Sequence, residues 1–414
     1  MEKGLIMKNR SLLLSLALAA PLLTLGAPAA LAASPASQAA ALHAAKPHAP
    51  AAREAPLPNP LPAPIEIVDN GPAANRIDLM FAGDGYTQAD LPKYRQAVND
   101  QWAAMTNLEP YKSYAKYFNV WRIDLVSPDS GVTSDPTKDV VKQTPLNMHF
   151  FCHGIDRLLC VDDAKSQALA KMVPNADVIF AIANSATYGG AGGPVITVAG
   201  GNSLASQVTP HEAAHTLAKL GDEYGGFGTA SDVTEPELPN VTVLTADQMA
   251  QQKTKWWRWL GVTAPDGSKI GSYPGANYFD AGYNRPSLDS DMRTLGQPFN
   301  QPSVEALIKS FYKYVKPIDS QTPAASTYLD GNSKVSITTP ALTGTDFQIY
   351  WGIDGTAIAQ GYGQRTLDLS KVKLPKGKWV GLTVTVRDNT AAVRDEDFRN
   401  ASMTQSVSWW IKPQ

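Results

Sequence analysis

Short apolar runs alternate with helical stretches between residues 63 and 318. The runs RIDLMFAG (76–83) and ADVIFAIA (176–183) are almost continuously apolar and predict buried strands, whereas VWRIDLVS (120–127) alternates more clearly between apolar and polar positions. Between the first and the last of these runs, LPKYRQAVNDQWAAMTN has apolar residues at helical spacing. The order of strand, helix and strand predicts a mixed α/β sheet packed by helices.

The pattern changes after residue 318. Short runs rich in β-branched and aromatic residues, namely SKVSITTP, TDFQIYWGID, GKWVGLTVTVRD and TQSVSWWI, are separated by turns of Gly, Pro, Asn and Asp. This spacing predicts a small all-β sandwich over residues 319–414, similar to an immunoglobulin or fibronectin module. The segment contains no histidine and no cysteine, so we expect it to pack or adhere rather than to catalyse.

The N-terminus has the pattern of an export signal. Basic residues precede the apolar run LLLSLALAAPLLTLGA, and the small residues of PAALAAS follow it, which predicts a secretory signal peptide over residues 1–33. Pro21 interrupts the run before it reaches the about 18 residues that a membrane span needs. Residues 34–62 are mostly Ala and Pro without an apolar period, which indicates a linker or a short propeptide. We therefore expect a secreted or periplasmic protein that is free of the membrane after signal cleavage.

The composition of the chain indicates which partners to exclude and whether its cysteines form a disulfide. The chain of 414 residues is 43% hydrophobic and 18% charged, enough to bury a sizeable core in about two domains. Its formal net charge of -2 offers no basic field for nucleic acid or anionic lipid, and we expect neither as a partner. The only cysteines, Cys152 and Cys160 in CHGIDRLLC, predict a disulfide in an exported protein.

The stretch TPHEAAHTLAKLGDEYGG (209–226) carries the most informative chemistry. On a helix, His211 and His215 lie four residues apart on one face, where both imidazoles can reach one ion. Glu212 lies about 100° round the helix, beside the open coordination position. This is the arrangement of metal-dependent hydrolases. A solvated helix face is the alternative, and the apolar neighbours Leu217 and Leu220 disfavour it.

A zinc site of this kind needs a third protein ligand and an open fourth position. On a continued helix, Asp222 would lie about 10 Å beyond the histidines, so the helix must end before it. We expect Gly221 to take a left-handed conformation there and to bend Asp222 back beneath the imidazoles. Glu223 is the rival ligand from the same turn, and a distant glutamate such as Glu235 or Glu237 is the third choice.

The segment HEAAHTLAKLGDEY closely resembles the zinc motif of the IgA-peptidase family of secreted bacterial metallopeptidases, which are relatives of the metzincins. Four further blocks agree with this family in order between residues 76 and 300: RIDLMFAGDGYT, FNVWRIDLVSPDSGV, NSATYGGAGG and YNRPSLDSDMR. One departure is visible, because Ala218 stands where many metzincin-like motifs have glycine.

The resemblance implies a metzincin-like catalytic domain over residues 63–318 and a role for each residue of the motif. His211, His215 and Asp222 would be the zinc ligands, and Glu212 would be the general base. Met292, in DSDMRT, would fill the methionine turn that forms an apolar floor below the metal.

These parts predict a secreted zinc endopeptidase that acts on peptides or proteins. Zinc lowers the pKa of its bound water and polarises the substrate carbonyl, while Glu212 accepts the water's proton and passes it to the leaving amine. Tyr224 and Tyr283 are candidates to stabilise the oxyanion. The resemblance supports a place beside the cleft for the glycine-rich segment YGGAGGPVITVAG (188–200), where it could pair with an extended peptide; a flexible loop without a ligand role is the alternative. The alternatives are an adhesion protein with a vestigial metal site and a zinc amidase that acts on cell-wall peptides.

Overall fold

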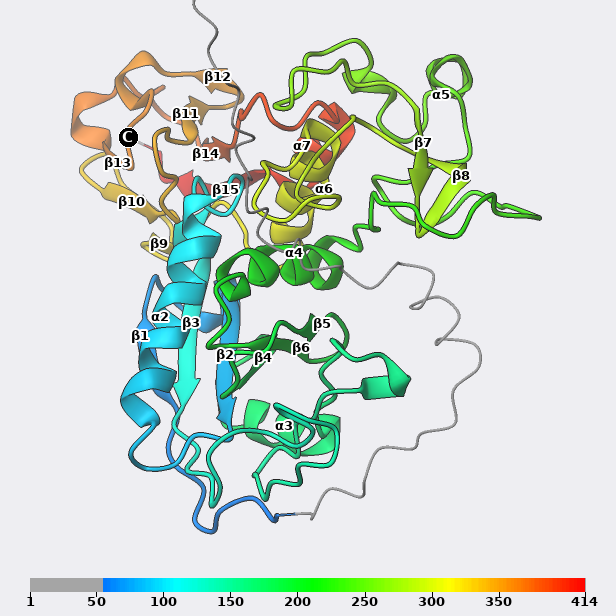
Figure 1. The fold of residues 1–414 in the computed structure, drawn as a ribbon. Helices are drawn as coiled ribbons and strands as arrows, with labels where there is room; N and C mark the ends of the chain where they lie inside the picture. The colour runs from blue at the N-terminus through cyan, green and yellow to red at the C-terminus, as the bar shows by residue number, and fades with distance from the viewer. Residues whose placement is uncertain (1–54, 414) are drawn as a thin grey trace, which may run out of the picture. The chain divides into compact units, whose positions relative to one another are not determined.

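The computed structural model describes residues 55–413 and contains a six-stranded mixed sheet that confirms the predicted α/β class (Figure 1). Its order is β1-β3-β2-β4-β6-β5; the four inner strands are parallel, and the two edge strands are antiparallel to their neighbours. The strands are β1 (Ile65–Val68), β2 (Ile77–Asp84), β3 (Phe118–Ile123), β4 (Ala176–Ala183), β5 (Gly190–Ala191) and β6 (Ile196–Ala199).

Two of the predicted strands match the structure closely and one does not. Strand β4 has the predicted bounds, and β2 is shifted by one residue from the predicted run. Strand β3 ends at Ile123, four residues before the predicted end at 127. The chain turns there because the N–H of Leu125 donates to the carbonyl of Ile123 at 3.1 Å, so alternation in the sequence continues past the point where pairing stops.

Helices cover both faces of this sheet. All eight residues of β2 are buried, because successive side chains point to opposite faces and each face is covered. Leu79 and Phe81 belong to a core with α2 (Leu91–Asn107) and α4 (Ala205–Ala218), whereas Met80 and Ala82 belong to a second core with α3 (Asp163–Ala170). Helix α2 has the predicted bounds. Helix α4, which carries His211 and His215, is thus fixed on one face of the sheet.

The chain between α4 and residue 318 forms a hairpin and two helices. The hairpin pairs β7 (Tyr273–Ala276) with β8 (Phe279–Arg285), and the helices are α5 (Ala246–Gln252) and α6 (Gln301–Phe311). Trp256, Trp257 and Trp259 belong to a third, smaller core, in which Trp256 and Trp259 are buried and Trp257 is partly buried. No helix within residues 55–413 is long and apolar enough to cross a membrane.

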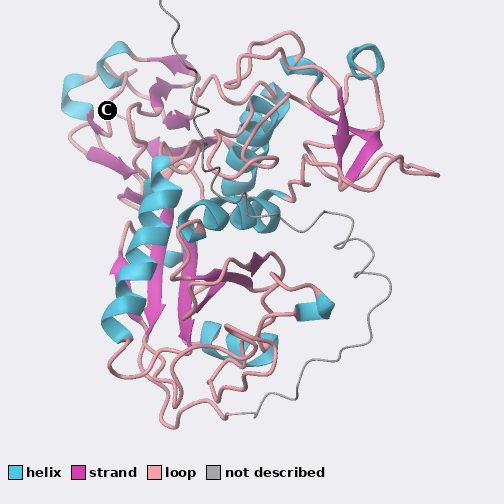
Figure 2. Ribbon diagram, in the orientation of Figure 1, coloured by secondary structure: helices cyan, strands magenta, loops and turns pink. Residues whose placement is uncertain are grey.

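The chain after residue 318 is built mainly from short strands and loops (Figure 2). It forms two antiparallel sheets of order β13-β10-β9 and β12-β11-β14-β15. The four predicted runs become β10, β11, β14 and β15; the likeness to an immunoglobulin module stays a prediction. The elements are β9 (Ser320–Thr322), β10 (Lys334–Thr338), β11 (Gln348–Ile353), β12 (Thr356–Ala357), β13 (Thr366–Asp368), β14 (Val380–Arg387), α7 (Glu396–Ser402) and β15 (Thr404–Ile411).

Buried polar contacts join these C-terminal sheets to the preceding chain. The Asp388 carboxylate accepts hydrogen bonds from Tyr114 at 2.5 Å and from Tyr312 at 2.7 Å. Arg76 forms a buried ion pair with Asp319 at 2.6 Å. Apolar residues of β11 and β14 lie in the same core as those of α2 and α4, so the C-terminal sheets support the helices that carry the site. The proposed boundary at residue 318 stays a prediction.

The predicted signal peptide (1–33) and residues 34–54 of the predicted linker lie outside the described residues. The last part of the linker packs against the rest of the chain. Ala55 is buried and its carbonyl accepts a hydrogen bond from Lys165 Nζ at 2.6 Å, while Leu57 and Leu61 pack against the second core.

Candidate metal centre

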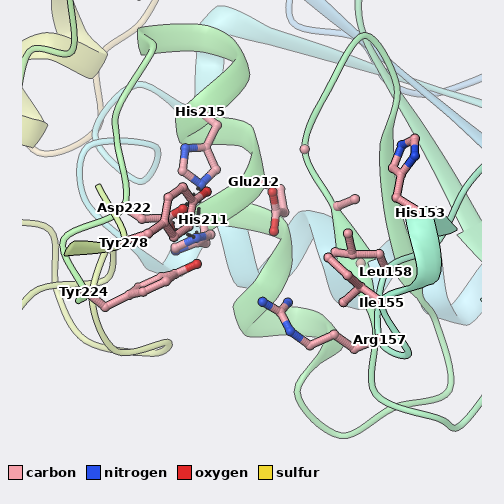
Figure 3. A pocket seen from close by; sticks show the side chains of 13 residues that line it. His153, Ile155, Arg157, Leu158, His211, Glu212, His215, Asp222, Tyr224 and Tyr278 are labelled. Carbon is pink, nitrogen blue, oxygen red and sulfur yellow. Dashed lines mark hydrogen bonds and ion pairs between the residues drawn. The ribbon is translucent and has the colours of Figure 1, made fainter. Parts of the chain in front are cut away.

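His211 and His215 project from one face of α4, and their Nε2 atoms lie 3.2 Å apart (Figure 3). The other ring nitrogen of each contacts a backbone carbonyl: His211 Nδ1 lies 2.9 Å from the Asp291 oxygen and His215 Nδ1 lies 2.6 Å from the Leu220 oxygen. A carbonyl can only accept, so both Nδ1 atoms carry the proton. In the neutral rings, the two Nε2 atoms therefore present lone pairs toward each other.

Helix α4 ends before Asp222, as predicted, but the residue that turns the chain is not the predicted one. Ala218 is the last helical residue, and Lys219 takes the left-handed conformation, with φ of 55° and ψ of 36°. The N–H of Leu220 then donates to the carbonyl of Ala214 at 3.3 Å, which closes the helix end. Our expectation that Gly221 makes this turn is wrong, since Gly221 is not among the residues with positive φ.

Gly221 is needed for space instead. A Cβ at this position would lie 2.6 Å from Leu238 Cδ1 and 2.9 Å from Val241 Cγ2. The side chain of Asn240 holds the residue from both sides, because its Oδ1 accepts from the Gly221 N–H at 2.7 Å and its Nδ2 donates to the Gly221 carbonyl at 2.8 Å. These contacts fix the course of the chain directly before Asp222.

Asp222 completes a group of three acceptor atoms. Its Oδ1 lies 3.2 Å from His211 Nε2 and 3.4 Å from His215 Nε2, and it is buried without a hydrogen-bond donor among residues 55–413. Three lone pairs at this separation repel one another unless a cation lies between them. Tetrahedral zinc, with bonds of about 2.0–2.1 Å, would separate its ligands by about 3.3–3.4 Å, so the three atoms fit such an ion.

The electrostatics of the group agree with this fit. Burial disfavours the charged form of His211, but a protonated Nε2 would donate a hydrogen bond to the charged Asp222 carboxylate; this outweighs burial and raises the pKa of His211 to about 10. Burial opposes the charged form of Asp222 as well, and the two histidines nevertheless hold its pKa well below the usual range. A proton and a metal ion therefore compete for the same acceptors.

Glu223, the rival ligand, faces away from the histidines. Its carboxylate accepts hydrogen bonds from Asn240 Nδ2 at 2.9 Å, Ser290 Oγ at 2.7 Å and Asn300 Nδ2 at 3.0 Å. Burial raises the pKa of Glu223, and these hydrogen bonds oppose that shift. The more distant Glu235 pairs with Lys255 at 2.8 Å. Glu237 is exposed and does not line the cleft.

Met292 is fully buried in a turn that contacts His211 on one side and Glu223, directly after Asp222, on the other. The turn is closed by the N–H of Arg293, which donates to the carbonyl of Ser290 at 2.9 Å. The carbonyl of Asp291 receives His211 Nδ1, and the carbonyl of Met292 accepts the N–H of Glu223 at 2.7 Å. The segment thus orients one histidine and anchors the chain after Asp222.

A cleft of about 270 Å³ opens beside these residues. Glu212 lines it next to the histidines, and so do Gly190, Ala191 and Gly192 of the glycine-rich segment, the place that the family resemblance implied for this segment. A Cβ on Gly192 would lie 2.8 Å from Glu212 Oε2, so a side chain at this position would push the Glu212 carboxylate out of its place. His215 is the more accessible of the two histidines, with a quarter of its side chain exposed compared with 9% for His211.

The opposite wall of the cleft is the loop closed by the disulfide between Cys152 and Cys160, which confirms the predicted bond. His153, Ile155, Arg157 and Leu158 of this loop line the cleft. The sequence analysis did not assign the loop a place in the site. In the sequence, the only local indication that this loop lines the cleft is the group of basic and apolar residues between the two cysteines.

Two tyrosines line the cleft, but only one of them was predicted. Tyr224 and Tyr278 are at the cleft, whereas Tyr283 is not among its lining residues and packs its ring 6.1 Å from that of Phe279. Burial raises the pKa of both cleft phenols above the usual range, so both keep their proton at neutral pH.

Tyr278 reaches the cleft because it lies in the tight turn between β7 and β8. Asn277 and Tyr278 both have positive φ, 50° and 72°, at positions where hairpin turns favour Asn and Gly. The Asn277 N–H donates to the carbonyl of Asp222 at 2.8 Å, and the Tyr278 N–H donates to that of Tyr224 at 3.1 Å. Turns of this kind favour Gly where Tyr278 stands, and such departures from local preference cluster at functional sites. This departure was the signal in the sequence that pointed to Tyr278.

Residues 65–267 match the model of the family described as IgA Peptidase M64. The matched range contains the sheet, α4 and Asp222, and it ends before the hairpin of Tyr278 and the turn of Met292. No curated protein matches the sequence.

Proposed function

Because the chain belongs to the IgA peptidase M64 family of metallopeptidases, we propose that it is a secreted zinc endopeptidase that cuts peptides in this cleft. One observation carries the proposal: the converging acceptor atoms of His211, His215 and Asp222, without a hydrogen-bond donor for Asp222 Oδ1 among residues 55–413. Secretion rests on the signal pattern of residues 1–33, and the disulfide supports it because such bonds persist in oxidising compartments.

The three residues named above would hold the ion, and Met292 would belong to a metzincin-like floor. Bound there, zinc would act as a Lewis acid toward the scissile carbonyl and lower the pKa of the attacking water. Glu212 is the general base: its carboxylate lies in the cleft, takes the proton of the attacking water and delivers it to the leaving amine. The proton therefore moves from one side of the scissile bond to the other on a single side chain.

Two further groups position the substrate and its developing charge. Strand β5 is the last strand of the sheet, and Ala191 and Gly192 line the cleft, so an extended peptide would lie along this segment. The protonated phenols of Tyr224 and Tyr278 would donate hydrogen bonds to the oxyanion that forms when the carbonyl is attacked.

The experiment is to incubate the purified chain, without residues 1–33, with a diverse peptide mixture and to identify the cut sites by mass spectrometry. Bound metal is measured in the same sample by inductively coupled plasma mass spectrometry. We expect internal cuts that stop after chelation and return with zinc. Cleavage that survives complete metal removal would refute the zinc mechanism, and absence of cleavage with zinc bound would refute the peptidase.

A further inference from the structure

Among the residues that the structure describes, Arg157 is the only lysine or arginine that lines the cleft. It lies in the disulfide loop, on the wall opposite His211, Asp222 and His215, and Figure 3 shows its guanidinium reaching from the loop into the cleft toward Tyr224. Within residues 55–413, no carboxylate or carbonyl accepts a hydrogen bond from this guanidinium. A charged side chain that enters a cleft without a partner is available to a ligand.

The loop holds the base of this side chain firmly. The carbonyl of Arg157 accepts the N–H of Gly190 on β5 at 3.3 Å, and the N–H of Cys152 donates to the carbonyl of Leu158 at 3.2 Å. Ile155 and Leu159 are buried on either side. The disulfide closes the same loop. Arg157 is therefore placed next to the segment along which a substrate would lie.

The charges in the cleft favour an anionic ligand. The formal charges of a divalent cation, Asp222 and Glu212 cancel, so Arg157 leaves the cleft positive. Arg157 lines the same cleft as Tyr224 and Tyr278, so its charge acts on the part of the cleft where the scissile bond would lie.

We propose that Arg157 determines specificity by binding the carboxylate of an aspartate or glutamate side chain close to the scissile bond of the substrate. A guanidinium suits this task because its planar fork can donate two parallel hydrogen bonds to one carboxylate. The proposal rests on the proposed peptidase function and names its substrate class: acidic peptides rather than neutral or basic ones.

The test uses peptides built on the sequence that the diverse mixture shows to be cut best. One position at a time near the scissile bond carries Glu, Gln or Lys, and every peptide is amidated at its C-terminus. At one position we expect wild-type kcat/KM to favour Glu over Gln by about 10- to 100-fold, the factor of a hydrogen bond to a charged group. Arg157→Gln should remove this preference mainly through KM, and Arg157→Glu should shift it toward Lys.

The matched controls are Arg157→Lys, which should keep part of the preference, and Arg95→Gln, which should keep all of it. Arg95 lies on α2, its side chain is 46% exposed in an ion pair with Asp124, and it does not line the cleft. Exposed pairs of this kind contribute little to stability. A preference that Arg157→Gln leaves intact, or an equal loss of kcat on all peptides, would refute the proposal.

Two more outcomes distinguish this proposal from recognition of a terminal carboxylate and from failure of the proposed peptidase function. A second set of the same peptides is made with a free C-terminus; if only this set depends on Arg157, the carboxylate is the terminal one and the side-chain proposal is wrong. If the wild-type protein cleaves nothing, calorimetry with Glu212→Gln compares binding of an amidated oligoglutamate and an amidated oligoglutamine of equal length, with and without Arg157→Gln. Equal binding would then refute the role of Arg157 independently of catalysis.

Discussion

Asp222 and Glu223 are neighbours in the sequence and both are buried. The carboxylate of Asp222 faces hydrogen-bond acceptors, whereas that of Glu223 faces hydrogen-bond donors. Asp222 Oδ1 lies next to the Nε2 atoms of two imidazole rings, and it accepts no hydrogen bond from any donor within residues 55–413. Glu223 meets the amide groups of Asn240 and Asn300 and the hydroxyl of Ser290. A buried carboxylate must be compensated; the protein supplies donors for Glu223, and the proposed metal ion would compensate Asp222.

The difference arises from what holds the chain on each side of the two residues. The carbonyl of Asp222 accepts from Asn277 in the hairpin turn, and the N–H of Glu223 donates to the carbonyl of Met292. The backbone is therefore held between two distant segments, with one side chain directed to the cleft and the other to the interior. Burial alone does not distinguish a metal ligand from a structural acid; the neighbouring atoms do.

The largest effect is expected from Asp222→Asn, which keeps the shape of the side chain and removes its charge. Loss of an outer-shell partner already weakens metal binding by about 10- to 100-fold, so loss of a ligand should cost at least about 100-fold and reduce peptidase activity to background. Metal content after dialysis and kcat/KM on the best peptide measure this. Full metal occupancy in the variant would contradict the assignment of Asp222.

Glu212→Gln should come next, because it removes the proton acceptor and leaves the three acceptor atoms in place. We expect an unchanged metal content and a fall in kcat of about 10²- to 10⁴-fold. Single-turnover rates and metal analysis of the same sample provide the measurement. Turnover at the wild-type rate would show that another group takes the proton.

Glu223→Gln is the matched change at the neighbouring residue. The amide keeps one acceptor oxygen but presents an NH₂ group to the donors of Asn240, Asn300 and Ser290, so the free energy of unfolding should fall by about 1–3 kcal/mol. The metal should remain bound. Urea unfolding of the metal-free proteins measures the difference, with the exposed Glu237→Gln as control. Metal loss as severe as in Asp222→Asn would reverse the roles of the two residues.

The smallest effect is expected from Asn240→Ala, since Asn240 contacts the metal ligands only through the backbone of Gly221 and the side chain of Glu223. Its loss should weaken zinc binding by about tenfold, at the lower end for outer-shell partners. Competition with a zinc-binding dye gives the affinity. An affinity equal to that of the wild type would show that Gly221 is held in place without Asn240.

Features that depend on local periodicity, or on residues close together in the chain, could be predicted from the sequence. The bounds of α2 and β4, the common face of His211 and His215, and the bond between Cys152 and Cys160 are of this kind. Their physical basis is the repeat of the helix and of the strand, and the short loop between two cysteines.

Features that depend on contacts between distant segments became visible only in the folded chain. The turn at Lys219 instead of Gly221, the different surroundings of Asp222 and Glu223, and the place of Tyr278 rather than Tyr283 all depend on residues such as Asn240, Asn277 and Met292. Arg157 enters the cleft for the same reason, because its loop packs against β5. The sequence shows which groups exist, and packing decides which of their atoms meet.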